Sequence, residues 1–300
     1  MPRLLSSSLK ELLKNDPLRM AGATAFFTTF ALPPILVILI QAFKLLIGGR
    51  AIRVELFDSL AGIVGPETVR QLIDIMRSMR RLAQNWYVTI GGFIFLLFVA
   101  TTLFKVIRNS LNQVWKIRPY AKRGLGKKLR SRAQSIAVIL IAGVLFIIGI
   151  IAEGAQAFIG SYIFELSPLL SVYFNTVLSQ IISILIVTVW FTIVFRFLPD
   201  GKPRWNIALA GGLLTSLLFA AGKAILHWLL SYSNINTLYG TSASIVLLLL
   251  FVFYASLILY YGAAFTKVWG IYRGLPILPR HYAMHYRVTE AEERGSGLGE

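Results

Sequence analysis

The sequence contains no cysteine, and that absence removes several kinds of chemistry at once. Disulfides, thiol catalysis, thiolate-bound zinc and iron–sulfur clusters all depend on cysteine side chains. The chain also lacks the HExxH and GxSxG motifs of hydrolases, a Walker loop and a glycine-rich dinucleotide turn. We therefore expect a protein that is not an enzyme and that holds no cofactor.

Acidic residues and histidines are scarce, which argues against a metal centre. The 13 Asp and Glu residues are scattered among connections and the tail, and the three histidines are His227, His281 and His285. His281 and His285 share an i,i+4 spacing, but two ligands do not make a zinc site. A nuclease that uses two metal ions needs clustered carboxylates or histidines. We expect no metal site.

Basic residues are abundant, yet their positions indicate a membrane rather than a nucleic acid. The 30 Lys and Arg residues give a formal net charge of +17. They concentrate just outside long apolar runs, where membrane topology alone would place them. The basic segment KRGLGKKLRSR, residues 122–132, is compatible with RNA or anionic lipid, but an ordinary solvated connection is the stronger interpretation. We expect no specific nucleic-acid partner.

Six long apolar runs fill most of the 300 residues, and the hydrophobic fraction is 56%. The mean hydropathy is +0.70. A helix needs roughly 20 apolar residues to cross the hydrocarbon core, and it satisfies its own backbone there. We predict an all-α, polytopic membrane bundle of six transmembrane helices. The predicted spans are Ala21–Ile47, Trp86–Ile107, Gln134–Phe158, Asn175–Phe195, Asn206–Leu230 and Ser242–Trp269.

Basic and uncharged connections alternate along the chain, and this alternation predicts the orientation. Lys and Arg gather in the amino-terminal segment, between the second and third spans, after the fourth span and in the tail. The connections 159–174 and 231–241 contain neither residue type. By the positive-inside rule, both termini are cytoplasmic. The domains are then a cytoplasmic segment 1–20, a membrane domain 21–270 and a cytoplasmic, partly disordered tail 271–300.

The first external connection, residues 48–85, departs from this alternation because it carries both charges. Apolar residues recur at helical spacing over 52–63 and again over 69–79. Gly65-Pro66 separates the two stretches, and proline suits a first helical position. We predict amphipathic helices that lie on the outer membrane face or cap the bundle. Whether they gate a path or only cover the bundle end is left open.

Ionisable residues at membrane depth are costly, and few occur here. Glu153 lies late in the third predicted span, Lys223 lies well inside the fifth, and His227 follows Lys223 by four residues. These three residues are candidates for a substrate or proton path. The alternative, given equal weight, is a structural Glu153–Lys223 ion pair or a Lys223 side chain that extends to the interface.

Two further features of the predicted spans concern helix shape and packing. Pro33 and Pro34 lie inside the first span and predict a kink, because proline removes a helical hydrogen bond. The fifth span repeats small residues at every fourth position, a pattern that lets helices approach closely. These small residues are Ala208, Gly212, Ser216, Ala220 and Ala224.

Several short segments, taken in order and spacing, match the pattern of one known family. They are AGATAFFTTFALPPILVIL after Asp16, then RNSLNQVWKI, LPDGKPRW, LYGTSASI and LYYGAAF. Together they resemble the first helix, the Asn-x-x-Trp segment, the Leu-Pro turn and the two ends of helix six in the YihY/BrkB family. The resemblance covers about residues 16–270. Its motif positions are Asp16, Asn112, Trp115, Pro199, Tyr239, Gly240 and Gly262.

The chain departs from that family at positions of chemical interest. Ala264 stands where many members carry a glutamate after Gly-Ala. Phe26, Phe27 and Ala31 occupy places in the first helix where Tyr and Ser are often found. A mechanism that rests on that carboxylate or on those hydroxyls is therefore not supported for this chain.

The resemblance implies a multi-pass protein of the bacterial inner membrane with a role in the cell envelope. The family's older label, ribonuclease BN, is generally regarded as a misassignment. We expect a transporter or flippase-like handler of a lipid or amphiphilic solute, with membrane lipids as partners. The alternative is a non-catalytic envelope scaffold or assembly factor, and a membrane ribonuclease has the least support. The oligomeric state, a homo-oligomer included, is left open.

Overall fold

The computed structural model is predominantly helical, as the sequence predicts. It describes residues 2–44, 54, 57–58, 60–61, 65–82, 86–120, 141, 144–145, 148–149, 168–232 and 243–286. The helices assigned in these ranges are α1 (Pro2–Leu13), α2 (Pro17–Lys44), α4 (Pro66–Leu82), α5 (Trp86–Val114), α7 (Pro168–Phe197), α8 (Trp205–Tyr232) and α10 (Ala243–Tyr272).

Three of these helices contain stretches long and apolar enough to span a membrane. They are Val177–Phe197 in α7, Trp205–Ile225 in α8 and Ile245–Tyr272 in α10. Helices α2 and α5 cover the first and second predicted spans. The third predicted span lies largely outside the described residues, so a bundle of six transmembrane helices stays a prediction.

The helix ends follow local sequence rules. Proline occupies the first position of α1, α2, α4 and α7, where its missing N–H costs no helical hydrogen bond. Helix α10 ends at Tyr272, and Gly274 just beyond it has a φ of +67°. The Gly274 N–H donates to Ile271 O, and the Leu275 N–H donates to Gly270 O. This paired arrangement is a Schellman motif, and it turns the chain back toward the bundle.

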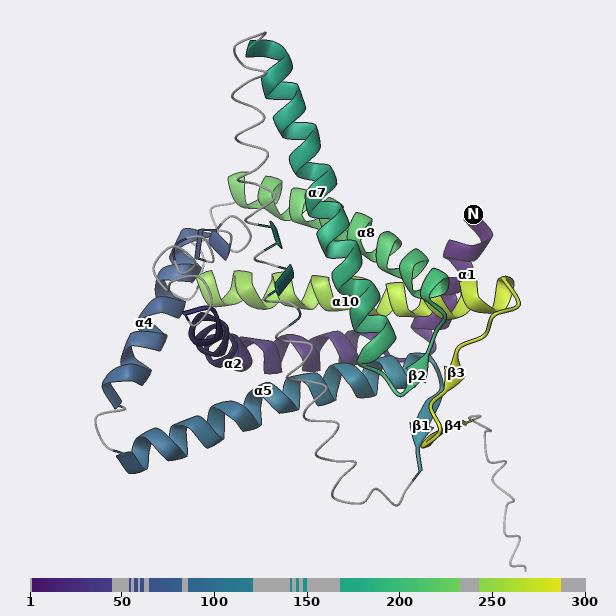
Figure 1. Cartoon of the computed structure of the whole chain (residues 1–300), viewed down its shortest axis with the longest axis horizontal. Coiled ribbons are helices and arrows are strands. Elements are labelled where there is room, and N and C mark those ends of the chain that lie inside the picture. The colour runs from purple at the N-terminus through teal and green to yellow at the C-terminus, as the bar shows by residue number, and fades with distance from the viewer. Residues whose placement is uncertain are drawn as a thin grey trace, which may run out of the picture.

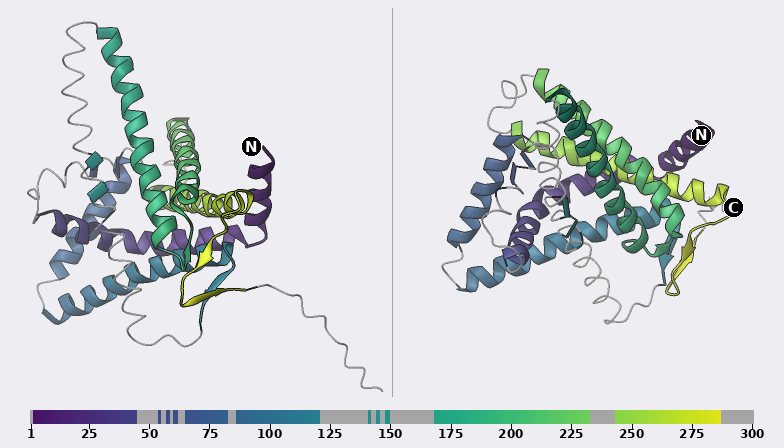
Figure 2. Two further views of the ribbon diagram at one scale, coloured as in Figure 1. Left: turned by 45° about the vertical axis from the view of Figure 1, so that its right-hand side comes forward. Right: turned by 45° about the horizontal axis from the view of Figure 1, so that its top comes forward.

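Helix α10 is the central element of the bundle (Figures 1 and 2). It packs against α1, α2, α4, α5 and α8, while α7 packs against α8 and α2 against α5. Figure 1 shows α2 and α10 side by side along the long axis of the molecule. Pro33 is buried inside α2, which continues through it to Lys44, and the predicted kink stays a prediction.

Two short antiparallel pairings close one end of the bundle, a departure from a purely helical fold. Strand β1 (Ile117–Pro119) pairs with β4 (Ala283–His285), and β2 (Gly201–Lys202) pairs with β3 (Leu278–Pro279). Both pairings join a connection between helices to the segment after α10. Residues 273–286 of the predicted tail are thus folded against the bundle, and residues 287–300 lie outside the described ranges.

Helix α4 packs at the opposite end of α10. Its buried Val69 contacts Leu248 of α10, and its buried Leu72 contacts Leu36 of α2. The opposite face of α4 carries exposed ion pairs, Glu67–Arg70 and Asp74–Arg77. This distribution of side chains is that of an amphipathic helix. The first predicted amphipathic stretch, residues 52–63, lies mostly outside the described residues.

Small residues let α7, α8 and α10 approach closely. A Cβ atom added to Gly211 would lie 1.9 Å from Thr266 Oγ1, and one added to Gly262 would lie 1.8 Å from Thr215 Oγ1. Gly211-xxx-Thr215 and Gly262-xxx-Thr266 are therefore reciprocal halves of the α8–α10 contact. Glycine is required at both positions because no side-chain atom fits there.

The predicted small-residue row of α8 lies partly against α7. A Cβ atom added to Gly212 would meet Thr192 Oγ1 at 2.4 Å, and the hydroxyls of Ser216 and Thr188 lie 2.6 Å apart. Ala208 is also buried, whereas Ala220 is half-buried and Ala224 is exposed. The amino-terminal part of the row is therefore the part in close contact with a neighbouring helix.

Candidate functional site

The three ionisable residues predicted at membrane depth do not form a site within the described part of the chain. Lys223 lies on α8, is half-buried and forms no ion pair with another described residue. His227 lies on the same helix, but its side chain is outside the described atoms. Glu153 is outside the described residues altogether. Their shared path stays a prediction.

The structure instead brings polar side chains from α5 and the α7–α8 connection together at the end closed by the strands. The Asn112 side chain donates to Asp200 Oδ2 at 2.7 Å and accepts from the Asp200 N–H at 2.8 Å. Asn112 is 4% exposed and Asp200 is 2% exposed. This reciprocal pairing fixes the end of α5 against the turn between α7 and α8.

Two arginines extend this arrangement, which we call the polar network: Arg108, Asn112 and Asp200 are buried in it, and Arg280 is half-buried. Arg108 Nε donates to Leu198 O at 2.7 Å. The Arg280 N–H donates to Asp200 O at 2.9 Å, and the Arg280 guanidinium donates to Arg196 O and Phe197 O. The network thus satisfies backbone carbonyls at the carboxyl end of α7, which that helix leaves without internal partners.

Arg108 marks a correction to the sequence-based boundary of the second span. The sequence places Arg108 in the connection after Ile107, yet α5 continues to Val114 and Arg108 is buried in it. Because Leu198 O receives its Nε–H, the guanidinium can be buried at the end of the helix. The helix therefore extends beyond the apolar run.

Trp115 and its neighbours form an apolar layer beside the network. Trp115 is almost fully buried, and its Nε1–H donates to Ala263 O at 2.9 Å. A Cβ atom on Gly201 would lie 2.7 Å from the Trp115 ring. Ala264 is fully buried in the same hydrophobic cluster. The position where the resemblance led us to look for a glutamate is thus filled by packed apolar atoms in this chain.

The other motif positions are distributed around this end of the bundle or lie beyond the described residues. Pro199 is buried next to Asp200, and Gly262 forms the close contact with α8. Asp16 is exposed between α1 and α2 with a φ of +52°, a conformation that Asp tolerates better than most residues. Tyr239 and Gly240 are outside the described residues.

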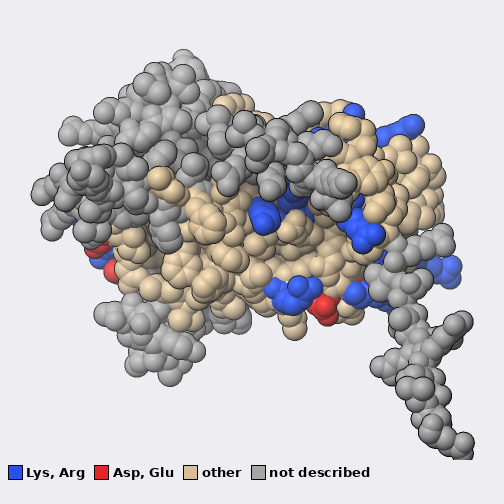
Figure 3. Space-filling view, turned by 90° about the horizontal axis from the view of Figure 1, so that it is seen from below, with Lys and Arg blue, Asp and Glu red and all other residues tan. Residues whose placement is uncertain are grey.

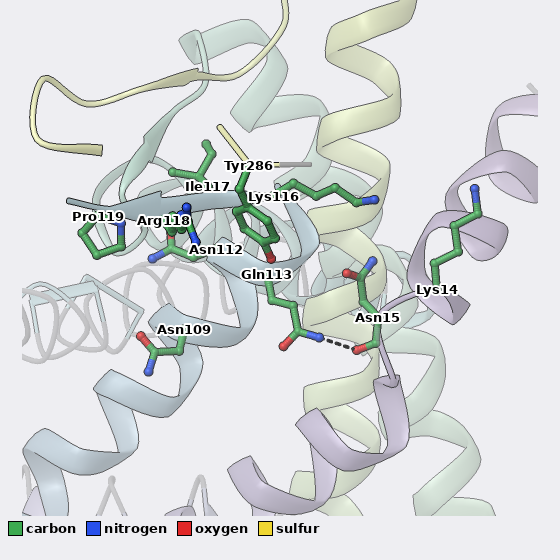
Figure 4. Close-up of a pocket in the computed structure, with 10 residues that line it drawn as sticks. All are labelled: Lys14, Asn15, Asn109, Asn112, Gln113, Lys116, Ile117, Arg118, Pro119 and Tyr286. Carbon is green, nitrogen blue, oxygen red and sulfur yellow. Dashed lines mark hydrogen bonds between the residues drawn. The ribbon is translucent and has the colours of Figure 1, made fainter. Parts of the chain in front are cut away.

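A cavity of about 700 Å³ opens directly over the network, and we call it the polar hollow (Figure 4). Asn112 belongs to both. The wall residues come from the α1–α2 junction, the end of α5, β1 and the residue after β4. They are Lys14, Asn15, Asn109, Asn112, Gln113, Lys116, Ile117, Arg118, Pro119 and Tyr286.

The polar hollow is rich in hydrogen-bond donors and positive charge. Its wall carries three cations, four carboxamide side chains and no carboxylate. Gln113 donates to Asn15 O at 3.1 Å and accepts from Arg19 at 3.4 Å, which orients its amide across the junction. Arg118 lies over the Tyr286 ring, 5.8 Å from its centroid. Figure 3 shows the molecule from below, and most of the Lys and Arg side chains visible there lie in the right half, the side on which the strands lie in Figure 1.

Helix α1 is held at the rim of the polar hollow by an ion pair that the sequence did not reveal. Lys267 of α10 donates to Glu11 Oε1 at 2.6 Å and to Val114 O at 2.9 Å. The side chains of both Lys267 and Glu11 are 18% exposed. The interaction joins α1, the end of α5 and α10. Among the described residues, no group of His, Cys, Asp or Glu could hold a metal ion.

From the sequence, the cations of the polar hollow are chiefly markers of topology, and the basic connection 116–132 is a weaker candidate for binding RNA or anionic lipid. The signal available in the sequence was the concentration of motif positions in two segments, Arg108–Ile117 and Leu198–Trp205. These segments are far apart in sequence and meet through Asn112 and Asp200. That meeting could not be read from either segment alone.

Comparison with known proteins gives a consistent picture. A family model described as virulence factor BrkB matches residues 8–273. A "UPF0761 membrane protein" of Actinobacillus pleuropneumoniae is 26% identical over 262 residues, covering 84% of this chain and 88% of the relative. Proteins of the same name from Saccharophagus degradans and Delftia acidovorans are 22% and 25% identical. The matches cover 88% of this chain in both cases, but only 59% and 61% of those two relatives. No solved structure matches.

Proposed function

This chain belongs to the BrkB virulence-factor family and is a membrane protein, and on that premise we propose that it binds the anionic head group of a membrane amphiphile in the polar hollow. The family resemblance predicted from the sequence is confirmed by the match over residues 8–273. The proposal concerns the step before any movement, namely the recognition of a phosphate-bearing or carboxylate-bearing head group.

The composition of the hollow wall carries the proposal. Lys14, Lys116 and Arg118 supply positive charge, and the carboxamides add neutral N–H donors. Charge-assisted hydrogen bonds from Lys and Arg to phosphate are among the stronger polar interactions in proteins. None of the residues that line the hollow carries a carboxylate that could pair with its three cations, so an anion is the complementary ligand.

Apolar surface beside the polar hollow favours an amphiphile over a free anion. Leu18 in the first turn of α2 is 67% exposed. It precedes Arg19, whose guanidinium reaches Gln113 of the hollow wall. An acyl chain lying along α2 would therefore be adjacent to a head group in the polar hollow. A soluble phosphate would use only the polar part of this surface.

We further infer a handling function, a transporter or flippase-like step in envelope biogenesis, with the alternative of a non-catalytic scaffold. This inference includes the six predicted spans and an inner-membrane location. It also includes cytoplasmic termini, because the polar hollow lies among the most basic connections, which the positive-inside rule assigns to the cytoplasm. Lys223 and Glu153 are the candidates for a path across the membrane. The sequence contains no ATP-binding motif, so movement would be passive or driven by a gradient.

Binding is tested first with the full-length protein in nanodiscs. Fluorescent phosphatidylglycerol and phosphatidylcholine with identical acyl chains serve as probes. The variant Lys116→Gln/Arg118→Gln removes two charges of the hollow wall, and Lys202→Gln/Arg204→Gln removes two exposed charges at the same end of the bundle. At about 1 kcal/mol per charge, roughly fivefold in affinity, the first variant is expected to weaken phosphatidylglycerol binding about 25-fold.

The control variant is expected to stay within about twofold of the wild type. Equal losses in both variants, or equal affinity for the two lipids, would overturn a head-group site. Competition by inorganic phosphate as strong as by lipid would replace the amphiphile with a free anion as ligand. Scrambling of the same lipids in liposomes, with Lys223→Met alongside, then tests movement. Binding without scrambling would favour the scaffold.

A further inference from the structure

Helix α1 presents three distinct faces around its axis. Ser8 and Leu12 are buried against the bundle. Leu5, Leu9 and Leu13 follow one another at i,i+4 spacing and are 36%, 48% and 61% exposed; we call them the leucine row. Arg3 and Lys10 lie exposed on a third face, which Lys14 continues one residue beyond the helix end; we call these three the basic row. At 100° per residue, the centres of the two rows lie roughly 120° apart.

Two contacts join α1 to the carboxyl-terminal half of α10. Tyr261 Oη donates to Leu5 O at 3.1 Å, and Lys267 pairs with Glu11. Figure 1 shows α1 crossing this end of α10 steeply inclined to the direction that α2 and α10 share. If α10 spans the membrane along its axis, α1 lies closer to the membrane plane than to the normal.

Aromatic side chains at the same end of the bundle indicate the level of the membrane surface. Trp269 and Tyr272 of α10 are stacked, and Arg273 lies over the Trp269 ring at 4.9 Å. Trp205 is exposed at the start of α8 and lies under the Arg196 guanidinium at 5.2 Å. Tryptophan, tyrosine and arginine collect where hydrocarbon meets head groups.

The orientation of Lys14 shows which way the basic row points. In Figure 4, Lys14 extends upward, away from the body of α2, to the level in the view at which β1 and Lys116 lie to its left. The basic row is thus directed to the level of the strands, and the leucine row faces about 120° away from it around the helix axis. An apolar face and a cationic face in this relation match a helix lying in a lipid interface.

We propose that α1 is an interfacial helix whose leucine row inserts into the anionic leaflet at the strand end of the bundle. The leucine row contacts the acyl chains of the bilayer, and the basic row pairs with the anionic head groups at its surface. This surface goes beyond head-group binding in the polar hollow, because it needs no ligand in that cavity.

Single cysteines can report the depth of α1 directly, because the chain contains none to remove. Full-length Leu9→Cys and Lys10→Cys proteins would each carry an environment-sensitive fluorophore in phosphatidylcholine–phosphatidylglycerol vesicles. The label at position 9 should be quenched by brominated lipid and protected from aqueous iodide severalfold better than the label at position 10. Leu250→Cys on the exposed surface of α10 and Lys202→Cys supply the lipid and water reference values.

Equal iodide quenching at positions 9 and 10, near the Lys202→Cys value, would overturn the insertion. The role of the basic row is tested separately with the variant Arg3→Gln/Lys10→Gln. In the wild type, phosphatidylglycerol should protect the label at position 9 from iodide better than phosphatidylcholine alone does, and the variant should lose this difference. Unchanged protection would remove the anionic lipid from the proposal. Lys116→Gln/Arg118→Gln leaves α1 intact and should not alter the quenching of the label at position 9. The experiment therefore distinguishes a failure of the proposed insertion of α1 from a failure of head-group binding in the polar hollow.

Discussion

The two ends of the bundle are stabilised in different ways. At the strand end, Asn112 and Asp200 exchange buried hydrogen bonds, and buried Arg108 donates to Leu198 O. At the α4 end, Val69 and Leu72 pack against apolar residues of α10 and α2. The polar interactions of α4 lie on its exposed face, where ion pairs contribute little to stability.

This difference indicates where the molecule requires a defined geometry. A buried hydrogen bond is directional, and a partner left alone in the interior costs the full penalty of its desolvation. Apolar contacts are nearly non-directional, so side chains of similar volume can replace one another. The polar hollow lies over the directional end, and its wall shares Asn112 with the network. The candidate site is therefore built on the less substitutable part of the bundle.

The largest expected effect comes from Asn112→Ala. It removes both hydrogen bonds to Asp200 and leaves two buried groups with fewer partners, which we expect to lower the free energy of unfolding by roughly 2–6 kcal/mol. Asn109→Ala is the matched control, since Asn109 is exposed on the same helix, and its effect should stay within about 0.5 kcal/mol. Unfolding in mixed micelles by titration with dodecyl sulfate compares the two. Similar values would contradict a special role for the network.

A smaller effect is expected from Gly211→Ala, because the new methyl group would overlap Thr266 and push α8 from α10. Overpacking of this kind costs about 1–3 kcal/mol. Gly22→Ala on α2 has no atom within 4 Å of the added Cβ, so it should be neutral or stabilising by up to about 1 kcal/mol. Thermal unfolding in detergent would rank them. Gly211→Ala/Thr266→Ala should recover part of the loss, and no recovery would place the clash elsewhere.

The smallest effect is expected at the α4 end, from Leu72→Met. Leu72 is buried against Leu36, but methionine has a similar volume and a flexible side chain, so the cost should stay below about 1.5 kcal/mol. Ile75→Met on the exposed face of α4 serves as control and should change nothing measurable. The same thermal assay applies. A larger loss than that of Gly211→Ala would reverse the proposed ranking of the two ends.

Much of the helical pattern was predictable because it depends on local composition. Apolar runs, prolines at helix starts and the glycine after α10 specify where most helices begin and end. The extension of α5 through Arg108 was not predictable, because the buried arginine depends on a distant carbonyl, Leu198 O, that accepts its hydrogen bond. The small-residue row of α8 indicated close packing, but not that Gly211 and Thr215 would face α10 while Gly212 faces α7.

The sequence by itself determined that this chain is a helical membrane protein of the BrkB family, since apolar length, charge placement and motif order are all properties of the linear chain. Only the tertiary structure decided which polar groups meet. Asn112 and Asp200 are 88 residues apart, and Glu11 and Lys267 are 256 residues apart. Such pairs form because a buried polar group must find a partner in space, and the fold, not the sequence distance, determines which partner is within reach.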